Sequence, residues 1–537
     1  MRGDLRNVTS APTWSLRERR AWCARFRALI VSSRGELIDL VCAEVHKTPA
    51  EALTQEIMPL AAACRWHERF SAGILKPRRV PGRPLWMLGE RHEVIRAPLG
   101  RVGIIATWNY PLQLLGVQIV QAMLGGNAVI VKPSERSPRS QRLLLEIARA
   151  AGADENVLRW TGAERSAAPR MLREQRLDHV LFTGSTQVGR EVAAWAAQTL
   201  TGTTLELSGS DSALVRADAD GALAARVIWQ SVTMNGGQTC MAPRRAIVAA
   251  PVYGAFMRTL AALAAGEPPR RLIDGAAAER CRTVVAGASA GGGRVLGRYG
   301  ANGRHPGACA AATASGSDRA AVFTPTAIAE CPVDSAAFAG EHFGPVLAVV
   351  AAGDDAEVLA LHETCPQRLN TMIFTRDVGA ARRLAPRLGS GLVTINDGVV
   401  PSGHPGATLT GRGLSGWGAS RGSVGLLAMT RPVTVARTGR WVRLPTDEPP
   451  AEQVRWLDRV TGWMYGGRGG GAGPNGTTAQ NSISEFHASA SELAPPASRL
   501  SSSSSPSSQA ASAELRSEGV SAPGGTDHAQ AQTGRAE

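Results

Sequence analysis

Residues 101–132 read RVGIIATWNYPLQLLGVQIVQAMLGGNAVIVK, and this stretch decides the fold class. A short β-branched run is followed by a longer segment with apolar residues at helical spacing, and a second β-branched run ends the unit. Two parallel strands need such a crossover segment between them, usually an α-helix. The stretch therefore predicts a strand–helix–strand unit in a parallel sheet.

The same alternation continues to residue 209 and recurs in a second cycle that starts near Ala222. In the first cycle we expect strands at residues 127–133, 157–160, 178–184 and 203–209, and helices at residues 111–126, 138–152, 168–175 and 186–200. In the second cycle we expect strands at residues 245–250, 321–328, 346–350, 371–375 and 392–396, and helices at residues 222–234 and 251–265. Repeated units of this kind predict an α/β fold with two doubly wound domains, the first of them Rossmann-like.

The two ends of the chain differ from these cycles. Residues 15–75 read as helices, because apolar residues recur at three- and four-residue spacing. Residues 466–537 are rich in Gly, Ser, Ala and Pro and hold too little apolar surface to offset the entropy of ordering. We therefore expect a group of helices before the two α/β cycles and a disordered tail after them.

Composition limits the function classes. The formal net charge is +14, but the basic residues are three lysines and 56 arginines (59 − 3), scattered rather than clustered. A surface that follows nucleic-acid phosphates needs a dense run of positive charge, so we expect no nucleic-acid partner. The eight cysteines show no CxxC pair and no Cys/His spacing suited to zinc, which predicts reduced thiols in the cytoplasm and no metal site.

No targeting or membrane segment is expected from the sequence. Residues 1–6, MRGDLR, lack the apolar region of a secretion signal. The longest apolar stretch, residues 112–124, is interrupted by glutamines at positions 113, 118 and 121.

Several segments carry residues suited to chemistry. In NGGQTCMAP, residues 235–243, Cys240 follows a turn whose free backbone amides can help to activate a thiol, although a lone cysteine is more often an inert core residue. Glu206 ends a strand-like run between two leucines, where apolar neighbours favour a general base, but taken alone the exposed face of an alternating strand explains it better. Asn109 stands between an apolar strand and Pro111, where an amide can donate to an oxyanion, although an asparagine more commonly forms a turn there.

Other segments suit a dinucleotide. Gly184 and Ser185 follow a strand and open a helix, where backbone amides and the helix dipole favour a pyrophosphate. Lys132 and Glu135 stand at the carboxyl end of a strand, within reach of ribose hydroxyls. Residues 341–346, EHFGPV, indicate by themselves only a turn.

Taken together and in this order, these segments closely resemble the aldehyde dehydrogenase superfamily from about residue 15 to about residue 435. The resemblance implies an enzyme that oxidises an aldehyde with NAD or NADP. It makes Cys240 the nucleophile that carries a thiohemiacetal and then a thioester, Glu206 the general base and Asn109 part of the oxyanion hole. It also gives the cofactor-binding residues Thr107, Trp108, Lys132, Ser134, Glu135, Gly184, Ser185, Gly189, Leu207, Glu341 and Phe343.

Within that set, the resemblance assigns parts of the cofactor. Lys132 and Glu135 bind the adenosine ribose, and Gly184 with Ser185 line the pyrophosphate. Glu341 holds the nicotinamide ribose, and Phe343 lies beside the ring. The choice between NAD and NADP stays open, because branches with a KPSE segment use either cofactor.

The sequence departs from the family pattern in several places. Ser208 and Ser210 replace a glycine and a lysine beside the base, Thr107 replaces a proline, and Gln118 replaces the lysine of many tetrameric members. Gln118 in place of this lysine makes the chain resemble the branch of the family that oxidises fatty and aromatic aldehydes. Near the C-terminal end, Leu409, Thr410 and Arg412 change a segment that shapes the substrate entrance in the family. Residues 266–320 match the family poorly, and we expect a reshaped or partly disordered surface there.

The resemblance also predicts the domain plan. Residues 1–84 and 99–211 form the dinucleotide-binding domain, residues 212–427 the catalytic domain, and residues 85–98 and 428–445 a β extension that exchanges strands across a homodimer or dimer of dimers. Two other hypotheses are weighed: a non-catalytic binding or scaffold protein, and an acylating dehydrogenase that transfers the acyl group to coenzyme A or phosphate. The second would not need Glu206.

Overall fold

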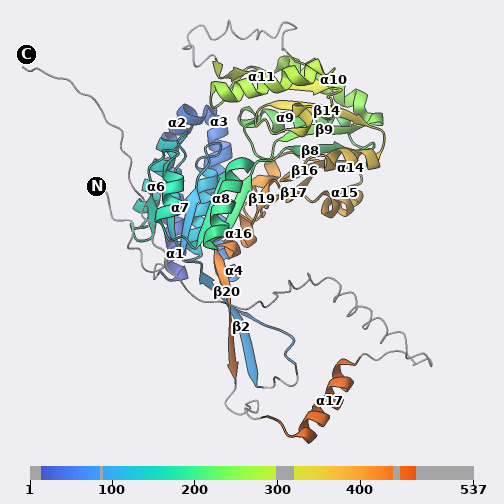
Figure 1. Cartoon of the computed structure of the whole chain (residues 1–537). Coiled ribbons are helices and arrows are strands. Elements are labelled where there is room, and N and C mark those ends of the chain that lie inside the picture. The colour runs from blue at the N-terminus through green and yellow to red at the C-terminus, as the bar shows by residue number, and fades with distance from the viewer. Residues whose placement is uncertain (1–13, 85–86, 88, 298–319, 439–447, 467–537) are drawn as a thin grey trace, which may run out of the picture. The chain divides into compact units, whose positions relative to one another are not determined.

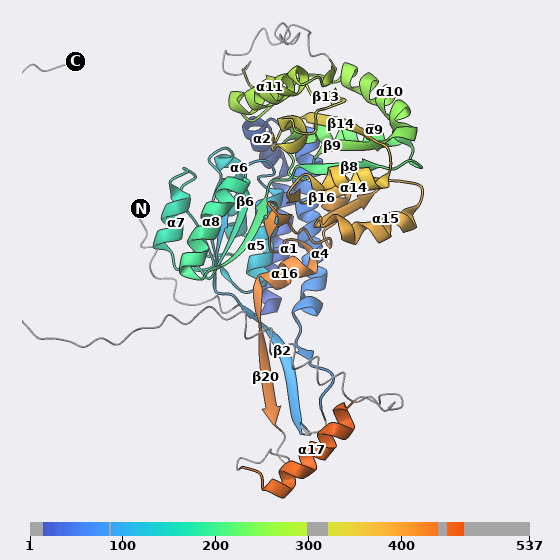
Figure 2. The same ribbon diagram turned by 45° about the vertical axis from the view of Figure 1, so that its right-hand side comes forward.

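The computed structural model describes residues 14–84, 87, 89–297, 320–438 and 448–466. By internal contacts the chain divides into two units, Met1–Leu444 and Pro445–Glu537. Both large sheets lie in the first unit (Figures 1 and 2). The described element of the second unit is helix α17 (Ala451–Tyr465).

The predicted N-terminal helices are present. They are α1 (Leu16–Ser32), α2 (Arg34–Val45), α3 (Pro49–Ala52) and α4 (Met58–Leu75), with a π-helical turn, η1 (Leu53–Ile57), before α4. Ser15 starts α1 and Thr48 starts α3, each through a capping box with the glutamate three residues later.

The first sheet has six strands in the order β19-β7-β6-β3-β4-β5. They are β3 (Arg101–Ile105), β4 (Ala128–Lys132), β5 (Leu158–Trp160), β6 (His179–Gly184), β7 (Gly202–Leu207) and β19 (Gly416–Trp417). All are parallel except β19, which runs antiparallel to β7. The strand order reverses between β3 and β6, and the carboxyl ends of such a pair border the ligand crevice of a doubly wound sheet.

Helices cover both faces of this sheet. They are α5 (Gln113–Leu124), α6 (Pro138–Ala150), α7 (Ala167–Glu174) and α8 (Thr186–Thr199). Val129 and Val131 pack with the N-terminal helices, α5 and α6, whereas Ile130 packs on the other face with α7 and α8. Because both faces are buried, the strands read as continuous apolar runs rather than alternating ones.

The second sheet has seven strands in the order β11-β13-β14-β9-β8-β16-β17. They are β8 (Asp211–Val215), β9 (Pro243–Ala249), β11 (Arg294–Leu296), β13 (Thr326–Ala329), β14 (Val346–Ala352), β16 (Asn370–Phe374) and β17 (Leu392–Ile395). Only β11 is antiparallel to its neighbour. One face packs on α9 (Gly221–Thr233) and α10 (Ala250–Gly266), and the other on α11 (Gly275–Ala290), α13 (Ala336–Ala339), α14 (Asp355–Glu363) and α15 (Val378–Leu384).

A third, three-stranded sheet joins distant parts of the chain. Its order is β1-β2-β20, with β1 (Arg78–Arg79), β2 (Glu90–Pro98) and β20 (Thr430–Thr438). β2 and β20 are antiparallel over their whole length and lie side by side in both views (Figures 1 and 2). The remaining short elements are β10 (Arg270–Arg271), β12 (Val322–Phe323), β15 (Gln367–Arg368), β18 (Arg412–Gly413), η3 (Met234–Gly237), η5 (Ala385–Leu388), η6 (Val400–Gly403) and α16 (Gly422–Ala428).

The α/β prediction with two doubly wound sheets is confirmed, but several details differ. The run at residues 321–328 forms two strands, β12 and β13, because Pro325 between them has no N–H for the ladder. Strand β8 was not predicted. The poorly matching region holds α11 and β11 up to residue 297, whereas residues 298–319 and the predicted tail from 467 onward lie outside the described residues.

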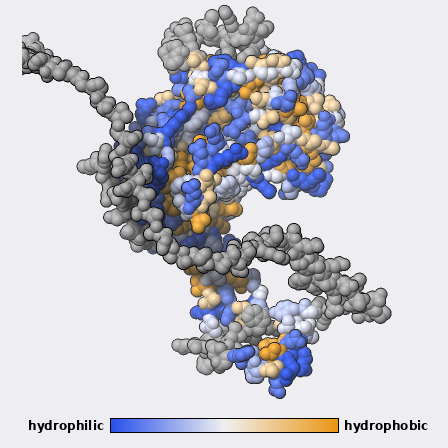
Figure 3. Space-filling view, viewed as in Figure 1, coloured by the Kyte–Doolittle hydropathy of each residue, from blue (hydrophilic) through white to orange (hydrophobic). Residues whose placement is uncertain are grey.

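Helix α17 carries several exposed large hydrophobic side chains. None of its residues is buried, and its exposed large side chains are Val454, Trp456, Leu457, Trp463 and Tyr465. Figure 3 shows hydrophobic residues among hydrophilic ones on this helix. Among the described residues, no helix combines the length and the apolar character needed to cross a bilayer.

Candidate active site

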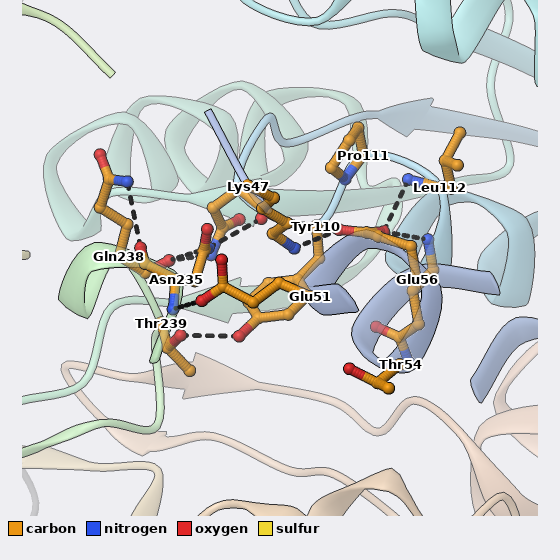
Figure 4. A network of polar contacts seen from close by, with 12 residues as sticks. Lys47, Glu51, Thr54, Glu56, Tyr110, Pro111, Leu112, Asn235, Gln238 and Thr239 are labelled. Atoms are coloured by element: carbon orange, nitrogen blue, oxygen red, sulfur yellow. Dashed lines mark hydrogen bonds and ion pairs between the residues drawn. The ribbon is translucent and has the colours of Figure 1, made fainter. Parts of the chain in front are cut away.

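Asn109 and Cys240, two of the predicted catalytic residues, lie on loops that hydrogen bonds join. Residues 106–112 follow β3, and residues 234–242 lie between α9 and β9. The Tyr110 hydroxyl is 2.7 Å from Thr239 Oγ1, and Asn109 Nδ2 donates to the carbonyl oxygen of Gln238 at 2.9 Å. Figure 4 shows Tyr110 directed at Thr239, next to Asn235 and Gln238. The predicted oxyanion residue and the predicted nucleophile therefore belong to one connected structure.

The loop before Cys240 has an unusual backbone. Asn235, Gly236 and Gly237 have φ angles of 54°, 59° and 72°, all in the left-handed region. Glycine adopts this region without steric cost and asparagine tolerates it better than most residues, which explains the sequence Asn-Gly-Gly. A Cβ on Gly237 would lie 2.3 Å from the backbone nitrogen of Pro345. The chain before the nucleophile thus turns tightly against the loop that contains Phe343.

A buried arginine binds both of these loops. Arg244 is fully buried and donates to the carbonyl oxygens of Gly237, Thr239 and Gly344. Its guanidinium carbon lies 5.9 Å from the centre of the Phe343 ring. Because charge-assisted hydrogen bonds are stronger than neutral ones, this side chain fixes the spacing between the two loops.

Cys240 is half-buried at the wall of a cavity. Burial, together with the negative charge of Glu206, raises the pKa of the Cys240 thiol to about 12, whereas Arg421 opposes that rise. The resting thiol is therefore protonated at neutral pH, and a base must remove its proton before it can attack.

Glu206 lies at the end of β7, close enough for its charge to act on Cys240. A Cβ on Gly209 would lie 2.5 Å from the carbonyl oxygen of Cys240, so the turn after Glu206 touches the nucleophile loop. Glu206 Oε2 accepts a 3.3 Å hydrogen bond from the Thr183 hydroxyl. Glu206 Oε1 is buried and has no hydrogen-bond partner within the described structure, which leaves it available to a proton donor.

Gln118, the residue in place of a family lysine, reaches Glu206 indirectly. Its Nε2 donates to Thr183 Oγ1 at 3.0 Å, and Thr183 donates to Glu206. Gln118 and Thr183 are both buried. A neutral amide therefore orients the hydroxyl that binds the base, and Thr183 is a supporting residue that sequence reasoning missed.

Asn109 is held on both sides. Its Oδ1 accepts from the Thr107 hydroxyl at 2.9 Å, so this departure from the family's proline supplies a hydrogen bond that proline lacks. Asn235 Nδ2 donates to the Asn109 carbonyl oxygen at 3.0 Å. The Asn109 side chain is 3% exposed, and its orientation is determined by these partners.

The N-terminal helices support this loop through a buried ion pair. Lys47 and Glu56 form the pair, and Glu56 Oε2 also accepts from the backbone N–H groups of Leu112 and Gln113, at the start of α5 (Figure 4). The Lys47 ammonium lies 3.7 Å from the centre of the Tyr110 ring. Burial lowers the pKa of Lys47 and raises that of Glu56, each against the attraction of the other charge.

Several predicted cofactor residues lie at the carboxyl ends of β4 and β6 or just after them, where a doubly wound sheet binds its ligand. Lys132 ends β4 and its ammonium is 2.9 Å from Glu135, which also accepts from Arg165 at 2.9 Å. Burial alone would raise the pKa of Glu135, but these hydrogen bonds lower it to about 2, so the carboxylate stays charged. Ser134 lies next to them, and its backbone N–H donates to Gln141 Oε1 at 2.7 Å.

The N-terminus of α8 faces the same edge of the sheet. Gly184 ends β6, and Ser185 caps α8 by accepting from the N–H of Val188. A Cβ on Gly189 would lie 2.5 Å from Leu207, so glycine permits the close packing of α8 on β7. Free amides at a helix N-terminus can bind a pyrophosphate, and the use of Gly184 and Ser185 for this purpose stays a prediction.

The loop of Glu341 and Phe343 contacts the segment after β3. The Trp108 and Phe343 rings pack edge to face with centroids 5.9 Å apart. Gln367 Nε2 donates to Glu341 Oε2 at 3.0 Å.

The two serines that follow Glu206 also make hydrogen bonds. Ser210, in place of the family lysine, donates to the carbonyl oxygen of Gly340, and so connects the segment after β7 to the loop of Glu341. The carbonyl oxygen of Ser208 accepts a hydrogen bond from the Ser415 hydroxyl.

The cavity beside Cys240 has a volume of about 430 Å³. Its walls combine apolar side chains such as Leu114, Met241 and Val399 with the charged Arg270 and Arg421. None of residues 409–412, where an altered entrance was expected, lines this cavity in the described structure. From the C-terminal part of the chain, its walls take Val399, Val400, Ser402, Gly403 and Arg421. Leu409 is instead buried and pairs with Ser420.

No signal in the sequence identified Arg421 or Arg270 as cavity residues, because neither belongs to a recognisable motif. The described residues include no group of three or more His, Cys, Asp or Glu side chains arranged to hold a metal ion. The seven cysteines in the described part of the chain are free thiols.

Comparison with known proteins places this geometry in a family. The model of the aldehyde dehydrogenase family matches residues 6–435. A 4,4'-diapolycopene aldehyde oxidase from a Methylomonas species is 29% identical over 414 residues, 74% of each chain. A Mycobacterium tuberculosis protein, provisionally named succinate-semialdehyde dehydrogenase [NADP(+)] 2, is 28% identical over 439 residues, which are 78% of this chain and 80% of that protein.

Solved structures of aldehyde dehydrogenases have the same fold as this chain. An NAD-dependent aldehyde dehydrogenase from Sinorhizobium meliloti has a TM-score of 0.73 at 26% identity and covers 82% of this chain and 85% of its own. An M. tuberculosis aldehyde dehydrogenase complexed with NAD+ has the same fold, with a TM-score of 0.72 at 24% identity over 81% of this chain and 88% of its own. The chain therefore belongs to the aldehyde dehydrogenase family and is an enzyme that oxidises an aldehyde with NAD or NADP.

Proposed function

We propose that Cys240 is the nucleophile, Glu206 the general base and Asn109 a donor of the oxyanion hole. The observation that supports this assignment is the convergence of their segments. Asn109 binds the main chain of Gln238, two residues before Cys240, and the turn after Glu206 touches Cys240 itself. The negative charge of Glu206 also raises the pKa of the Cys240 thiol.

The proposed reaction begins when Glu206 takes the proton from Cys240 Sγ. The sulfur then forms a bond to the aldehyde carbon, and the carbonyl oxygen, now negative, accepts from Asn109 Nδ2 and the Cys240 N–H. When bound, the nicotinamide supplies the acceptor for the hydride that this carbon loses, which leaves a thioester on Cys240. Glu206 releases the proton from Cys240 to solvent and then removes a proton from water, whose oxygen attacks the thioester carbon. The carbon–sulfur bond breaks, and the carboxylic acid leaves.

Glu206 distinguishes this hydrolytic reaction from acyl transfer. Its Oε1 atom is buried and without a partner in the described structure, while Thr183 holds the other oxygen. A carboxylate held in this way suits activation of a water molecule, which transfer of the acyl group to coenzyme A does not need.

For the cofactor, we propose that Lys132 and Glu135 hold the adenosine ribose and that Gly184 and Ser185 line the pyrophosphate. Glu341 holds the nicotinamide ribose and Phe343 lies beside the ring, while Thr107, Trp108, Ser134, Gly189 and Leu207 complete the set. Arg165 beside Glu135 supplies a cation that suits a 2′-phosphate, so the site fits either cofactor.

We further propose the domain plan and a homo-oligomer. The six-stranded sheet is the centre of the dinucleotide-binding domain, and the seven-stranded sheet is the centre of the catalytic domain. Strand β20 is exposed along most of its length and forms one edge of its sheet, with β2 on its other side. An exposed edge strand is suited to pairing with a second subunit. A cytoplasmic location stays a prediction from the cysteine pattern.

The test is NADH or NADPH formation by the purified protein on short, long-chain and aromatic aldehydes. Wild type is expected to reduce one or both cofactors, and Cys240→Ala is expected to abolish the reaction. Glu206→Gln is expected to lower the steady-state rate by at least about 100-fold, because general-base catalysis contributes on that order. Full activity in Cys240→Ala would refute the assignment. The scaffold hypothesis gains instead if wild type binds dinucleotide but oxidises no aldehyde.

A further inference from the structure

Arg421 is the most unusual charged residue of the cavity. It directly precedes α16, has a φ angle of 60°, and is 9% exposed. Its backbone N–H donates to Gln121 Oε1 at 3.1 Å, which fixes the position of the main chain. Arg421 and Cys240 line the same cavity, and the charge of Arg421 acts on the Cys240 thiol.

The guanidinium of Arg421 has more donors than acceptors around it. Nη1 donates to the Ser402 carbonyl oxygen at 2.8 Å and Nη2 to Gln113 Oε1 at 3.2 Å, and both acceptors are neutral. Nε is buried without a partner, and no carboxylate among the described residues forms an ion pair with this side chain. A guanidinium has five N–H groups and stays charged at neutral pH, so a buried one without a counter-ion is costly.

The other arginine of the cavity wall is already paired, because Arg270 forms an ion pair with Glu267 at 2.9 Å. Glu51, the carboxylate of the wall, accepts hydrogen bonds from the backbone N–H of Asn235 and the Thr48 hydroxyl. Arg421 is thus the cation in the described wall that lacks an opposite charge. A negatively charged group within the cavity would supply it.

We propose that Arg421 forms a subsite for a carboxylate of the substrate, so that the preferred substrates are oxo acids, aldehydes with a carboxylate at the other end of a short chain. This inference rests on the proposed role of Cys240 as the nucleophile. The planar guanidinium presents parallel N–H groups that match a carboxylate. A cavity of about 430 Å³ suits a small molecule that reaches from the sulfur to the guanidinium.

The alternative role for Arg421 is stabilisation of the Cys240 thiolate, and it predicts a different pattern. A cation that acts only on the sulfur accelerates the oxidation of every aldehyde alike. A cation that binds the substrate favours charged substrates over neutral ones of the same length. The discriminating quantity is therefore the ratio of kcat/KM for 4-oxobutanoate to kcat/KM for its methyl ester, because any effect on the thiol cancels in this ratio.

The experiment measures this ratio in wild type and in Arg421→Met, Arg421→Lys and Arg270→Gln. Loss of a buried charged hydrogen bond to a ligand is expected to lower the ratio about 100-fold in Arg421→Met, mainly through a higher KM for 4-oxobutanoate. Arg421→Lys is expected to retain part of the preference. Arg270→Gln, which removes an arginine of the same cavity that is already paired, is expected to keep the ratio within about threefold of wild type.

A wild-type ratio near one, or an equal ratio in wild type and Arg421→Met, would overturn the subsite and leave the proposed function intact. Oxidation of neither substrate points to failure of the proposed function instead. In that case the subsite is tested by alkylation. Protection of Cys240 from iodoacetamide by butanedioate in wild type, but not in Arg421→Met, supports it, and absence of protection in wild type overturns it.

Discussion

At the scale of single residues, the reactivity of Cys240 is a balance between opposed influences. Burial and the charge of Glu206 raise the pKa of the thiol, and Arg421 lowers it. The same carboxylate that disfavours a thiolate in the resting protein is the proposed acceptor of its proton. A protonated, half-buried thiol is protected from solvent oxidants, since the thiolate is the reactive form.

This balance predicts opposite effects of two substitutions on alkylation of Cys240 by iodoacetamide in the absence of cofactor. Glu206→Gln removes a negative charge and lowers the pKa of the thiol, so alkylation at pH 9 is expected to become up to about tenfold faster as the thiolate fraction rises. Arg421→Gln is expected to slow it. Because six other free cysteines are described, the rate is read from the Cys240 peptide by mass spectrometry. Slower alkylation in Glu206→Gln would contradict the electrostatic account.

The residues of this site that stand in recognisable motifs could be predicted from the sequence, and the residues outside such motifs could not. Cys240, Glu206 and Asn109 each follow a strand or a turn whose residue types suggest their chemistry. Arg421 and Thr183 act through neighbours that are distant in the chain, Gln113 and Ser402 for the first and Glu206 for the second. Such partners are determined by tertiary packing, which one sequence does not reveal.

At the scale of elements, the loop of Asn109 depends on the N-terminal helices and the residues between them. Glu56 in the π-helical turn η1 accepts the first backbone N–H groups of α5, and Lys47, after α2, covers the ring of Tyr110. A negative charge at a helix N-terminus is favourable, because the helix dipole is positive there. The N-terminal helices are thus part of the support of the active site.

We expect Glu56→Gln to destabilise the protein by about 3–5 kcal/mol, because it leaves the Lys47 ammonium buried without its counter-ion. Glutamine can still accept from the N–H groups of α5, so the substitution isolates the charge. The double variant Lys47→Met/Glu56→Gln is expected to recover part of the loss, as measured by denaturant unfolding. If the double variant is less stable than Glu56→Gln, the pair is not the source of the effect.

The predictability of the elements follows from their local patterns. The central strands were predicted because continuous apolar, β-branched runs are typical of strands that are buried on both faces. Strand β19 was missed, because Gly416 and Trp417 carry no strand period and pair with β7 only through tertiary contact. Gly416 has a φ angle of 91°, and a Cβ there would lie 2.1 Å from the carbonyl oxygen of Leu205. The π-helical turn η1 was likewise hidden within a helical pattern.

At the scale of the whole molecule, the sheet of β2 and β20 has little core of its own. β20 is exposed apart from its first residue and Val433, and the edge away from β2 has no neighbouring strand among the described residues. Long exposed edges favour pairing with another chain, so the proposed oligomer would cover this strand.

We expect Val435→Pro to shift the protein toward monomer, because proline removes a backbone donor and fixes φ in a strand that must pair. Val435→Thr, which keeps the N–H and the β-branched shape, is the matched control and is expected to keep the wild-type mass. Sedimentation velocity measures both. An unchanged mass in Val435→Pro would show that the subunits associate through another surface, or not at all.

The left-handed run before Cys240 restricts how a chain of this kind diverges over evolutionary time. At Gly237 both the dihedral angle and the 2.3 Å approach to Pro345 exclude any side chain, so we expect amino-acid changes at that position to be selected against. A relative at 29% identity differs from this chain at most aligned positions, and we expect such differences to accumulate where side chains have more space. The cavity of about 430 Å³ beside Cys240 offers such space, so we expect the substrate range to change more readily over evolutionary time than the geometry of the nucleophile loop.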